Sequence, residues 1–274
     1  MRIGVDTMSS TKPRGAAIGR CLRCHAPLGG GADCSGCGRS HPVVGGIWEA
    51  IGPLDGANRV ASAFYSGPGW RRFRKWEHLF LCVQGGPRWA RRQVLRHLPE
   101  RPGCRVLEVG IGDGANLSYL PVGWEIFGVD IARPRLSACL ARHGRSAGRL
   151  SHAEAEALPY DDDSFDAVFT VGGFNHFGDP GAALREMRRV ARPGAPLVAA
   201  DEVPDLPKYG LGHLIGVPSL DRRWMRALGL DPDFADLVLS TPLDVDAVAS
   251  AEWPHHRRHR IWGGLGYCLV DHKA

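Results

Sequence analysis

The sequence lacks the long apolar runs that a membrane-spanning protein needs. No run of about 18 apolar residues occurs, so we expect no transmembrane helix. The segment from Met1 to Arg20 also lacks an apolar core, which argues against a secretory signal peptide and favours a cytoplasmic protein. Lysine is scarce, with 4 lysines beside 30 arginines, and we interpret this bias as a codon preference for G and C. The proportions of 44% hydrophobic and 23% charged residues are ordinary and argue against a disordered chain.

Length and charge together indicate more than one segment. A chain of 274 residues fits one domain of catalytic size with an appendage. The net charge of +5 divides unevenly: residues 1–105 hold 17 basic and 6 acidic side chains, a net +11, whereas residues 106–274 hold 17 and 23, a net −6. This asymmetry leaves two interpretations open, an anionic partner such as RNA or two pieces of chain with different roles.

Four of the eight cysteines form two CxxC pairs, a spacing typical of a zinc site. The pairs are Cys21 with Cys24 and Cys34 with Cys37, and nine residues separate them. Two tight turns of this kind can aim four thiolates at one ion in a tetrahedral arrangement. Unpaired cysteines and two disulfides are the alternatives. Because we expect no signal peptide, we favour a structural Zn²⁺.

The segment from Cys21 to Ile47 resembles a short zinc-ribbon module. It reads CLRCHAPL and then CSGCGRSHPVVGGI, with Leu22 in place of the usual proline and His41 in place of the usual tyrosine. The resemblance implies a closed structural metal site within residues 21–50, which follow a flexible N-terminus over residues 1–20. A module of about thirty residues buries too little apolar surface to fold alone, so metal binding would supply its folding free energy.

Arginines and aromatic residues are concentrated in residues 51–102, which we interpret as a helical linker or lid. The apolar spacing predicts one helix around Phe73 and a second over residues 88–98 with Trp89 and Val94 turned inward. Interleaved basic and aromatic side chains could form an RNA-binding surface. We favour the alternative, in which the aromatic residues pack in the core and the charges face solvent.

The pattern that points to chemistry begins with an apolar strand over residues 105–109. The strand runs into a glycine-rich turn with Gly110, Gly112 and Gly114, which lets a ligand approach the backbone and the start of the following helix. A second strand ends at Asp130, where a carboxylate can accept hydrogen bonds from both hydroxyls of a ribose. The same spacing satisfies the dinucleotide-binding pattern, which is weak on its own.

Three further features favour S-adenosylmethionine (SAM) over a dinucleotide. Glu108 lies two residues before the first glycine, where its carboxylate can order the turn and reach the amino group of the ligand. A third strand near residues 148–152 leads into the acidic, alanine-rich residues 153–160. An acidic turn over residues 161–166 then leads into an apolar fourth strand.

These stretches resemble the class I SAM-dependent methyltransferases, particularly the branch that includes the ubiquinone and menaquinone C-methyltransferases. The resemblance covers Arg105 to about Asp201 and includes ALREMRRVARPG, which begins at Ala183. It implies an α/β fold with a Rossmann-like seven-stranded sheet and helices on both faces, over residues 103–274. Residues 203–260 would form a variable lid over the acceptor, and Ile261 to Val270 would be the final strand.

Carried over position by position, the resemblance implies a cofactor site. The three glycines would line the amino-acid part of SAM, and Asp130 would hold the ribose. Glu154 stands where the family usually has aspartate, and it would accept from the adenine amino group beside the Ala155 backbone. Ile131 would cover the adenine face, with a core position as the alternative. The expected cofactor-binding residues are therefore Glu108, Gly110, Gly112, Gly114, Asp130, Ile131, Glu154 and Ala155.

On the acceptor side, His176 follows the fourth strand at the expected mouth of the methyl-transfer site. Imidazole titrates near neutrality, so we expect His176 to act as a general base or to orient the acceptor. A structural histidine is the alternative, because methyl transfer needs little beyond alignment. The fifth strand ends in Asp201 and Glu202, which could bind a cationic or hydroxylated acceptor or lie in a solvated loop. A basic cluster around His259 is expected in a solvated turn.

Together these features predict an enzyme in which an acceptor displaces the methyl group of SAM in line and releases S-adenosylhomocysteine. A small-molecule acceptor, quinone-like or a secondary metabolite methylated on oxygen or carbon, is the first choice. One alternative is an RNA methyltransferase, because a zinc ribbon ahead of a methyltransferase domain also resembles the bacterial rRNA guanine-N1 methyltransferases. The other alternative is a non-enzymatic partner protein that retains SAM binding.

Overall fold

The computed structural model describes residues 19–28, 32–83, 85–144, 149–204, 214–215, 217–240 and 243–274. Nearly all of the expected flexible N-terminus and the first part of the expected lid lie outside these residues. Among the helices of the described ranges, none combines the length and the hydropathy needed to cross a bilayer.

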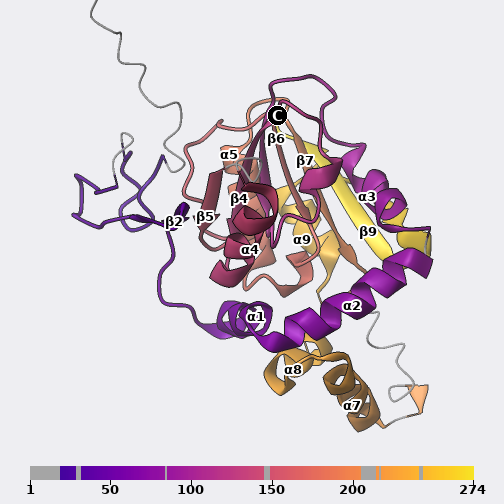
Figure 1. The fold of residues 1–274 in the computed structure, drawn as a ribbon. Helices are drawn as coiled ribbons and strands as arrows, with labels where there is room; N and C mark the ends of the chain where they lie inside the picture. The colour runs from indigo at the N-terminus through magenta and orange to yellow at the C-terminus, as the bar shows by residue number, and fades with distance from the viewer. Residues whose placement is uncertain are drawn as a thin grey trace, which may run out of the picture.

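A mixed sheet runs through the centre of the molecule (Figure 1). Its strands lie in the order β1-β2-β5-β4-β3-β6-β7-β9-β8. The run β5-β4-β3-β6-β7 is parallel, and β9 and β8 complete one edge in antiparallel orientation. The strands are β1 Val43–Val44, β2 Ile47–Glu49, β3 Arg105–Val109, β4 Glu125–Asp130, β5 Arg149–His152, β6 Ala167–Val171, β7 Pro196–Glu202, β8 Arg257–Ile261 and β9 Gly266–His272.

Helices cover both faces of the sheet, as the resemblance implies. Successive residues of β3 point to different cores: Leu107 packs in the core that holds α5 and α9, and Val106 in the core that holds α3. The α/β fold class is therefore confirmed. The helices are α1 Gly56–Ser66, α2 Pro68–Val83, α3 Pro87–Leu95, α4 Arg133–His143, α5 Pro180–Val190, α7 Pro218–Leu228, α8 Pro232–Ser240 and α9 Val245–Glu252.

The sheet has nine strands in the described residues, where the resemblance implies seven. The two additional strands are the hairpin β1–β2 from the cysteine-bearing segment, and β2 pairs in parallel with β5. In Figure 1 this indigo segment extends the sheet beside β5. The expected ribbon is thus not a separate appendage, because its backbone hydrogen bonds continue the catalytic sheet.

The C-terminal end of the chain forms a hairpin, and the prediction of one strand from Ile261 to Val270 is wrong. The chain turns over Trp262–Gly264, where all three residues have positive φ angles, and returns as β9. His259 and its neighbouring arginines lie in β8 at the sheet edge, not in a solvated turn. Charged side chains on an edge strand oppose pairing with another chain.

The described residues between the ribbon and β3 form the helices α1, α2 and α3. Val94 is buried, but Trp89 is 46% exposed, so the prediction that Trp89 turns inward is wrong. Helices α1 and α2 pack with α7 and α8 below the sheet in the view of Figure 1, and we call this group the helical cap. Phe64 of α1 stacks on Phe234 of α8, with ring centroids 4.0 Å apart.

Only part of the expected lid lies over the sheet edge that carries the glycine-rich turn. Helices α7 and α8 belong to the helical cap, and their buried residues form a cluster with those of α1. In contrast, α9 packs against α5 in the main core, where Trp253 is fully buried and donates to the carbonyl of Leu184. The sequence predicted a lid over residues 203–260 because its similarity to the family fades there, and similarity does not distinguish a lid from a core helix.

Candidate active site

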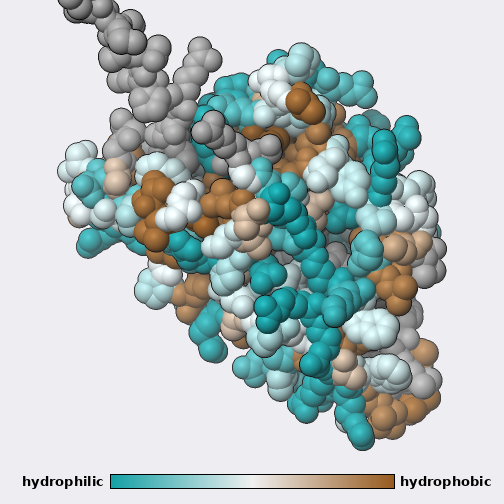
Figure 2. Space-filling model, in the orientation of Figure 1, coloured by the Kyte–Doolittle hydropathy of each residue, from teal (hydrophilic) through white to brown (hydrophobic). Residues whose placement is uncertain are grey.

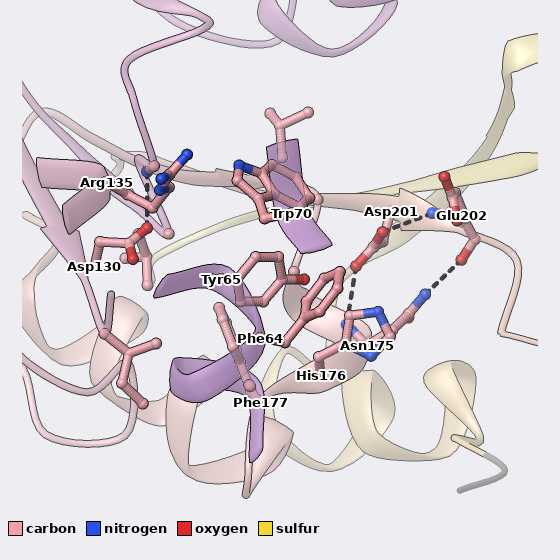
Figure 3. Close-up of a pocket in the computed structure, with 18 of the residues that line it drawn as sticks. Phe64, Tyr65, Trp70, Asp130, Arg135, Asn175, His176, Phe177, Asp201 and Glu202 are labelled. Carbon is pink, nitrogen blue, oxygen red and sulfur yellow. Dashed lines mark hydrogen bonds between the residues drawn. The ribbon is translucent and has the colours of Figure 1, made fainter. Parts of the chain in front are cut away.

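A cavity of about 430 Å³ lies where β3, β4, β6 and β7 reach their carboxyl ends. Parallel α/β sheets bind ligands at this edge. Figure 3 shows Asp130 and Arg135 on one side of the cavity, and Asn175, His176 and Asp201 on the other. Aromatic side chains of the helical cap stand between the two sides. The cavity therefore joins the expected cofactor site to the expected acceptor site.

The glycine-rich turn after β3 is held against the end of β4. Gly110 and Ile111 both donate from their backbone nitrogens to the carbonyl of Val129, at 2.8 and 3.0 Å. Gly110 and Gly112 have φ angles of +73° and +56° and line the cavity. At such angles a side chain would be strained, and its absence leaves the backbone open to a ligand.

Gly114 has a different role from the one the resemblance implies. It does not line the cavity, and a Cβ atom there would lie 2.8 Å from side-chain atoms of Leu117, Cys139 and His143. Its φ angle is +75°. The glycine at this position lets the turn pack closely against α4, and contact with a ligand is left to Gly110 and Gly112.

Asp130 connects the glycine-rich turn to the start of α4. One carboxylate oxygen accepts from the backbone N–H of Gly112 at 2.8 Å, and the other from that of Ala132 at 2.7 Å. Burial raises the pKa of Asp130 to about 6, against the opposing effect of these hydrogen bonds. Each carboxylate oxygen keeps a lone pair for a further donor. The position agrees with the expected contact to a ribose.

Glu108 supplies a buried acceptor without a partner. The side chain is 1% exposed, Oε1 accepts from Nδ2 of Asn116 at 2.6 Å, and Oε2 has no hydrogen-bond partner among the residues that the structure describes. Burial raises the pKa of Glu108 to about 8, and the hydrogen bond from Asn116 and the charge of Arg91 oppose that rise. An unpaired buried oxygen costs free energy, so a ligand with an ammonium or amide donor fits this place.

Among the residues expected to contact the adenine, one is not where the resemblance places it. Ile131 and Ala155 line the cavity, but Glu154 does not. Oε2 of Glu154 accepts from Nδ2 of Asn58 in α1 at 2.9 Å. The acid that lines the cavity is Glu156, whose Oε2 is buried without a partner. The sequence has a glutamate at both position 154 and position 156. The contact of Asn58 in α1 with Glu154 distinguishes the two.

His176 lines the cavity. The sequence led us to expect an imidazole that titrates near neutrality, and the structure differs on this point. Burial lowers its pKa to about 4, so the imidazole is neutral at pH 7. Its ring packs edge-on against Phe234 of the helical cap, with centroids 5.0 Å apart. A base with so low a pKa accepts a proton poorly. His176 is thus placed to shape the cavity or to donate a hydrogen bond.

This burial gives His176 a predictable effect on acid stability. Between pH 6.5 and 4 the unfolded chain binds a proton that the folded chain does not, so acidification favours unfolding. We expect His176→Gln to reduce the loss of unfolding free energy between pH 7 and pH 5 by about 1–2 kcal/mol. Urea unfolding at the two pH values measures the difference. An equal loss in both proteins would contradict a neutral, buried imidazole.

Asp201 and Asn175 form the polar end of the acceptor side. Asp201 accepts from the backbone nitrogens of Asn175 at 2.9 Å and Glu202 at 2.8 Å, and burial raises its pKa to about 6. The Asn175 amide donates to the Glu202 carbonyl and accepts from the hydroxyl of Tyr267 at 2.7 Å. Figure 3 shows Asn175, Asp201 and Glu202 joined by hydrogen bonds beside His176. Of the two alternatives for Asp201, the solvated loop is excluded by its burial.

The prediction of a linker or lid over residues 51–102 allowed Tyr65 and Trp70 to cover the acceptor, but it named no other aromatic side chain of the helical cap. Phe64, Tyr65 and Trp70 line the cavity together with Phe234 of α8. Tyr65 and Trp70 meet edge to face, with centroids 5.0 Å apart. No sequence signal distinguishes a cavity wall from an ordinary core here, because both require apolar residues at helical spacing. The cap makes the acceptor side of the cavity apolar.

The four predicted metal ligands are brought together outside the cavity. The Sγ atoms of Cys21, Cys24, Cys34 and Cys37 all lie within 4.8 Å of one another. The distances Cys21–Cys37 and Cys24–Cys34 are 3.6 and 3.3 Å, near the edge of about 3.8 Å for tetrahedral zinc with bonds of about 2.3 Å. His41 is buried with Nε2 at 3.4 Å from Sγ of Cys21, so it supports a thiolate. This donor set fits Zn²⁺.

Comparison with known proteins agrees with this geometry. Residues 107–199 match the family model of a methyltransferase domain. The chain is 37% identical over 139 residues to a demethylmenaquinone methyltransferase from Roseiflexus castenholzii, which covers 48% of this chain and 58% of that protein. It is also 37% identical over 118 residues to methyltransferase GfsG from Streptomyces halstedii, with 40% and 42% covered. A solved SAM-dependent methyltransferase from Aquifex aeolicus is similar over 81% of this chain and 100% of its own, with 16% identity and a TM-score of 0.49.

The chain spans about half the length of the curated relatives it matches. The matched region contains the glycine-rich turn, Asp130 and the strands β4 to β6, all of which contribute to the cavity or its support. The glycine-rich turn follows β3, the central strand of the sheet. Over residues 107–199, the chain is therefore similar in sequence to methyltransferase domains.

Proposed function

We propose that the protein methylates a small-molecule acceptor with SAM as the methyl donor. The observation that carries this proposal is the buried, unpartnered Oε2 of Glu108, which lies in one cavity with Asp130 and the glycine-rich turn. SAM, when bound, supplies an electrophilic methyl group. Its amino group would meet Glu108, its ribose would meet Asp130, and Ile131 and Ala155 would contact the adenine.

The acceptor end of the cavity supports a planar, largely apolar substrate with a hydroxyl group. Phe64, Tyr65 and Trp70 offer aromatic faces and exclude water. Asp201 and Glu202 both line the polar end of the cavity. With its pKa of about 6, Asp201 is largely ionised at neutral pH and can accept a proton from a hydroxyl. A quinone-like compound or a phenolic secondary metabolite meets both requirements, and alignment of its reacting atom is the main task of the cavity.

Two measurements test this proposal in sequence. Isothermal titration calorimetry with S-adenosylhomocysteine should detect binding to one site per chain. Incubation with SAM and a panel of hydroxylated naphthoquinones and phenols should then yield a product heavier by one methylene in mass spectrometry. Absence of cofactor binding would refute the enzyme and the SAM-binding partner alike. Binding without turnover of any acceptor would favour the non-enzymatic partner.

The alternative RNA substrate is favoured by one specific observation. A second cleft of about 400 Å³ lies between α2 and α4, and the described residues that line it are five cationic side chains, His78 and the acid Asp113. The five are Arg71, Arg74, Lys75, Arg135 and Arg142. Figure 2 shows hydrophilic side chains gathered over this part of the surface. Phosphate groups would neutralise this excess of positive charge. An RNA affinity that falls steeply with salt, and that is lost when Arg71 and Lys75 become glutamate, would favour RNA over a small molecule.

We further propose that the four cysteines hold a structural Zn²⁺. Sulfur ligands at tetrahedral spacing, with His41 at hydrogen-bond distance from one of them, support this assignment. The ion would close residues 21–50 into the hairpin that joins the sheet. Four thiolates on zinc are most stable in a reducing compartment, and on that ground we propose a cytoplasmic location.

A further inference from the structure

The ribbon hairpin meets the sheet at the strand that leads into the adenine side of the site. Strand β2 pairs with β5 in the register Ile47 with Leu150 and Glu49 with His152. The backbone nitrogen of Ala50 continues the ladder by donating to the carbonyl of His152 at 2.9 Å. His152 is the last residue of β5, so the next residues of the chain enter the cavity wall.

Glu49 is the charged centre of this junction. Oε1 lies 2.6 Å from Nε of Arg133, and Oε2 lies 2.7 Å from Nδ1 of His152. A second nitrogen of Arg133 donates to the carbonyl of Val44 in β1 at 2.8 Å. The side chains of Glu49 and His152 are 22% and 15% exposed. One carboxylate of the ribbon thus binds both the end of β5 and the first residue of α4.

His152 connects Glu49 to the side of the cavity where we expect the cofactor. Its Nε2 lies 3.1 Å from the carbonyl oxygen of Ile131, which also accepts from Oγ of Ser62 in α1. The two ring nitrogens of His152 therefore each face an oxygen atom, so the imidazole bridges the Glu49 carboxylate and the backbone carbonyl of Ile131. Ile131 and the preceding Asp130 both line the cavity.

We propose that Glu49 is a positioning residue for the SAM site, and that it acts through His152 and Arg133 on the segment from Asp130 to Arg133. The inference rests on the proposed function, because it assigns this segment to the ribose and adenine of SAM. According to this proposal, the ribbon contributes to the geometry of the cofactor site and is not a docking module. Charge at Glu49 holds the segment in its binding geometry before the ligand arrives, which lowers the cost of binding.

The consequence is a selective loss of cofactor affinity. In Glu49→Gln the carboxylate is lost but the size is kept, so β2 can remain paired while Arg133 loses its counter-charge and Nδ1 of His152 loses its carboxylate partner. We expect the Kd for S-adenosylhomocysteine and the KM for SAM to rise about tenfold. The kcat at saturating SAM and the KM for the acceptor should stay within about twofold, because the acceptor side of the cavity does not touch this junction.

A matched control is available on the same sheet. Glu125 at the start of β4 also pairs with two arginines, Arg105 at 3.1 Å and Arg149, but it lies at the opposite end of the strand from the cavity. Glu125→Gln therefore removes a similar pair of ion contacts without touching the segment after Asp130. We expect its Kd for S-adenosylhomocysteine to equal that of the unmodified protein.

The experiment measures S-adenosylhomocysteine binding by calorimetry for the unmodified protein, Glu49→Gln, Glu49→Asp, His152→Gln, the double variant Glu49→Gln with His152→Gln, and the Glu125 control. If the two residues act as one unit, the double variant binds no more weakly than the weaker single variant. Glu49→Asp retains the charge and should recover part of the affinity. His152→Gln changes no residue of the ribbon. If Glu49→Gln does not fold, binding by His152→Gln still tests the proposal.

Two outcomes would overturn the inference. One is an unchanged Kd in Glu49→Gln and His152→Gln when the unmodified protein binds. The other is an equal loss in the Glu125 control, which would mean that the effect comes from general loss of stability. If the unmodified protein itself does not bind S-adenosylhomocysteine, the proposed function fails first, and the two failures are thereby distinguished.

Discussion

Asp130→Ala should weaken the binding of S-adenosylhomocysteine by about a hundredfold or more. A carboxylate that accepts two ribose hydroxyls makes two hydrogen bonds to a charged group, each contributing about 1.5–3 kcal/mol. The substitution also frees the backbone N–H groups of Gly112 and Ala132, which hold the glycine-rich turn and the start of α4. Calorimetry gives the change directly.

Two further variants separate these contributions. Asp130→Asn keeps one side-chain oxygen and removes the charge, so it should bind with intermediate affinity. Asp161→Ala, in the exposed acidic turn, changes the same type of residue at a distance from the cavity and should bind as the unmodified protein does. Undiminished binding by Asp130→Ala would contradict the assignment of the ribose to this carboxylate.

The second large effect is expected at the cysteines. A double variant with Cys34→Ser and Cys37→Ser should fall from about one zinc per chain to none, because two thiolates do not complete a tetrahedral site. The metal contributes folding free energy on the order of 10 kcal/mol in small zinc modules, so residues 21–50 should unfold locally. Elemental analysis and limited proteolysis with trypsin, which has Arg23 and Arg39 within this segment, provide the measurements.

Cys82→Ser serves as the control for this experiment. Cys82 is an exposed thiol in α2 and lies outside the cysteine cluster, so its replacement should change neither zinc content nor the rate of cleavage. Zinc retained at one equivalent in the double variant would contradict the four-cysteine site. Zinc loss without faster cleavage would show that the hairpin is held by its pairing with β5 alone.

Local sequence patterns were enough to predict the elements whose structure depends on neighbouring residues. The apolar strands, the glycine-rich turn and Asp130 at the end of β4 were all predicted, because a buried parallel strand, a turn with positive φ and an acid at a strand end each leave a local sequence signature. The position of the four thiols near one point also followed from spacing alone. Gly110 and Gly112 line the cavity, while their contact with the cofactor stays a prediction.

Where the prediction failed, a distant segment decided the outcome. Glu154 and Glu156 are two acids in one short stretch, and Asn58 of α1, nearly a hundred residues earlier, binds the first. His176 has an ordinary sequence context, and the burial that lowers its pKa to about 4 occurs beside a cavity wall that includes Phe234 of the distant helix α8. Helical spacing alone did not reveal that Trp89 faces outward.

The largest difference between expectation and structure concerns the basic front of the chain. Composition separated it from the acidic back half at Arg105, and the CxxC spacing indicated a module with its own metal. Only the tertiary structure joins that module to the catalytic sheet through β2 and β5, and joins Glu49 to His152. Strand pairing depends on backbone groups and on the open edge of β5, neither of which leaves a signature in the sequence. The local sequence therefore specifies the strands and turns of this protein. Which strands pair with each other, as β2 does with β5, depends on the free energy of the whole fold.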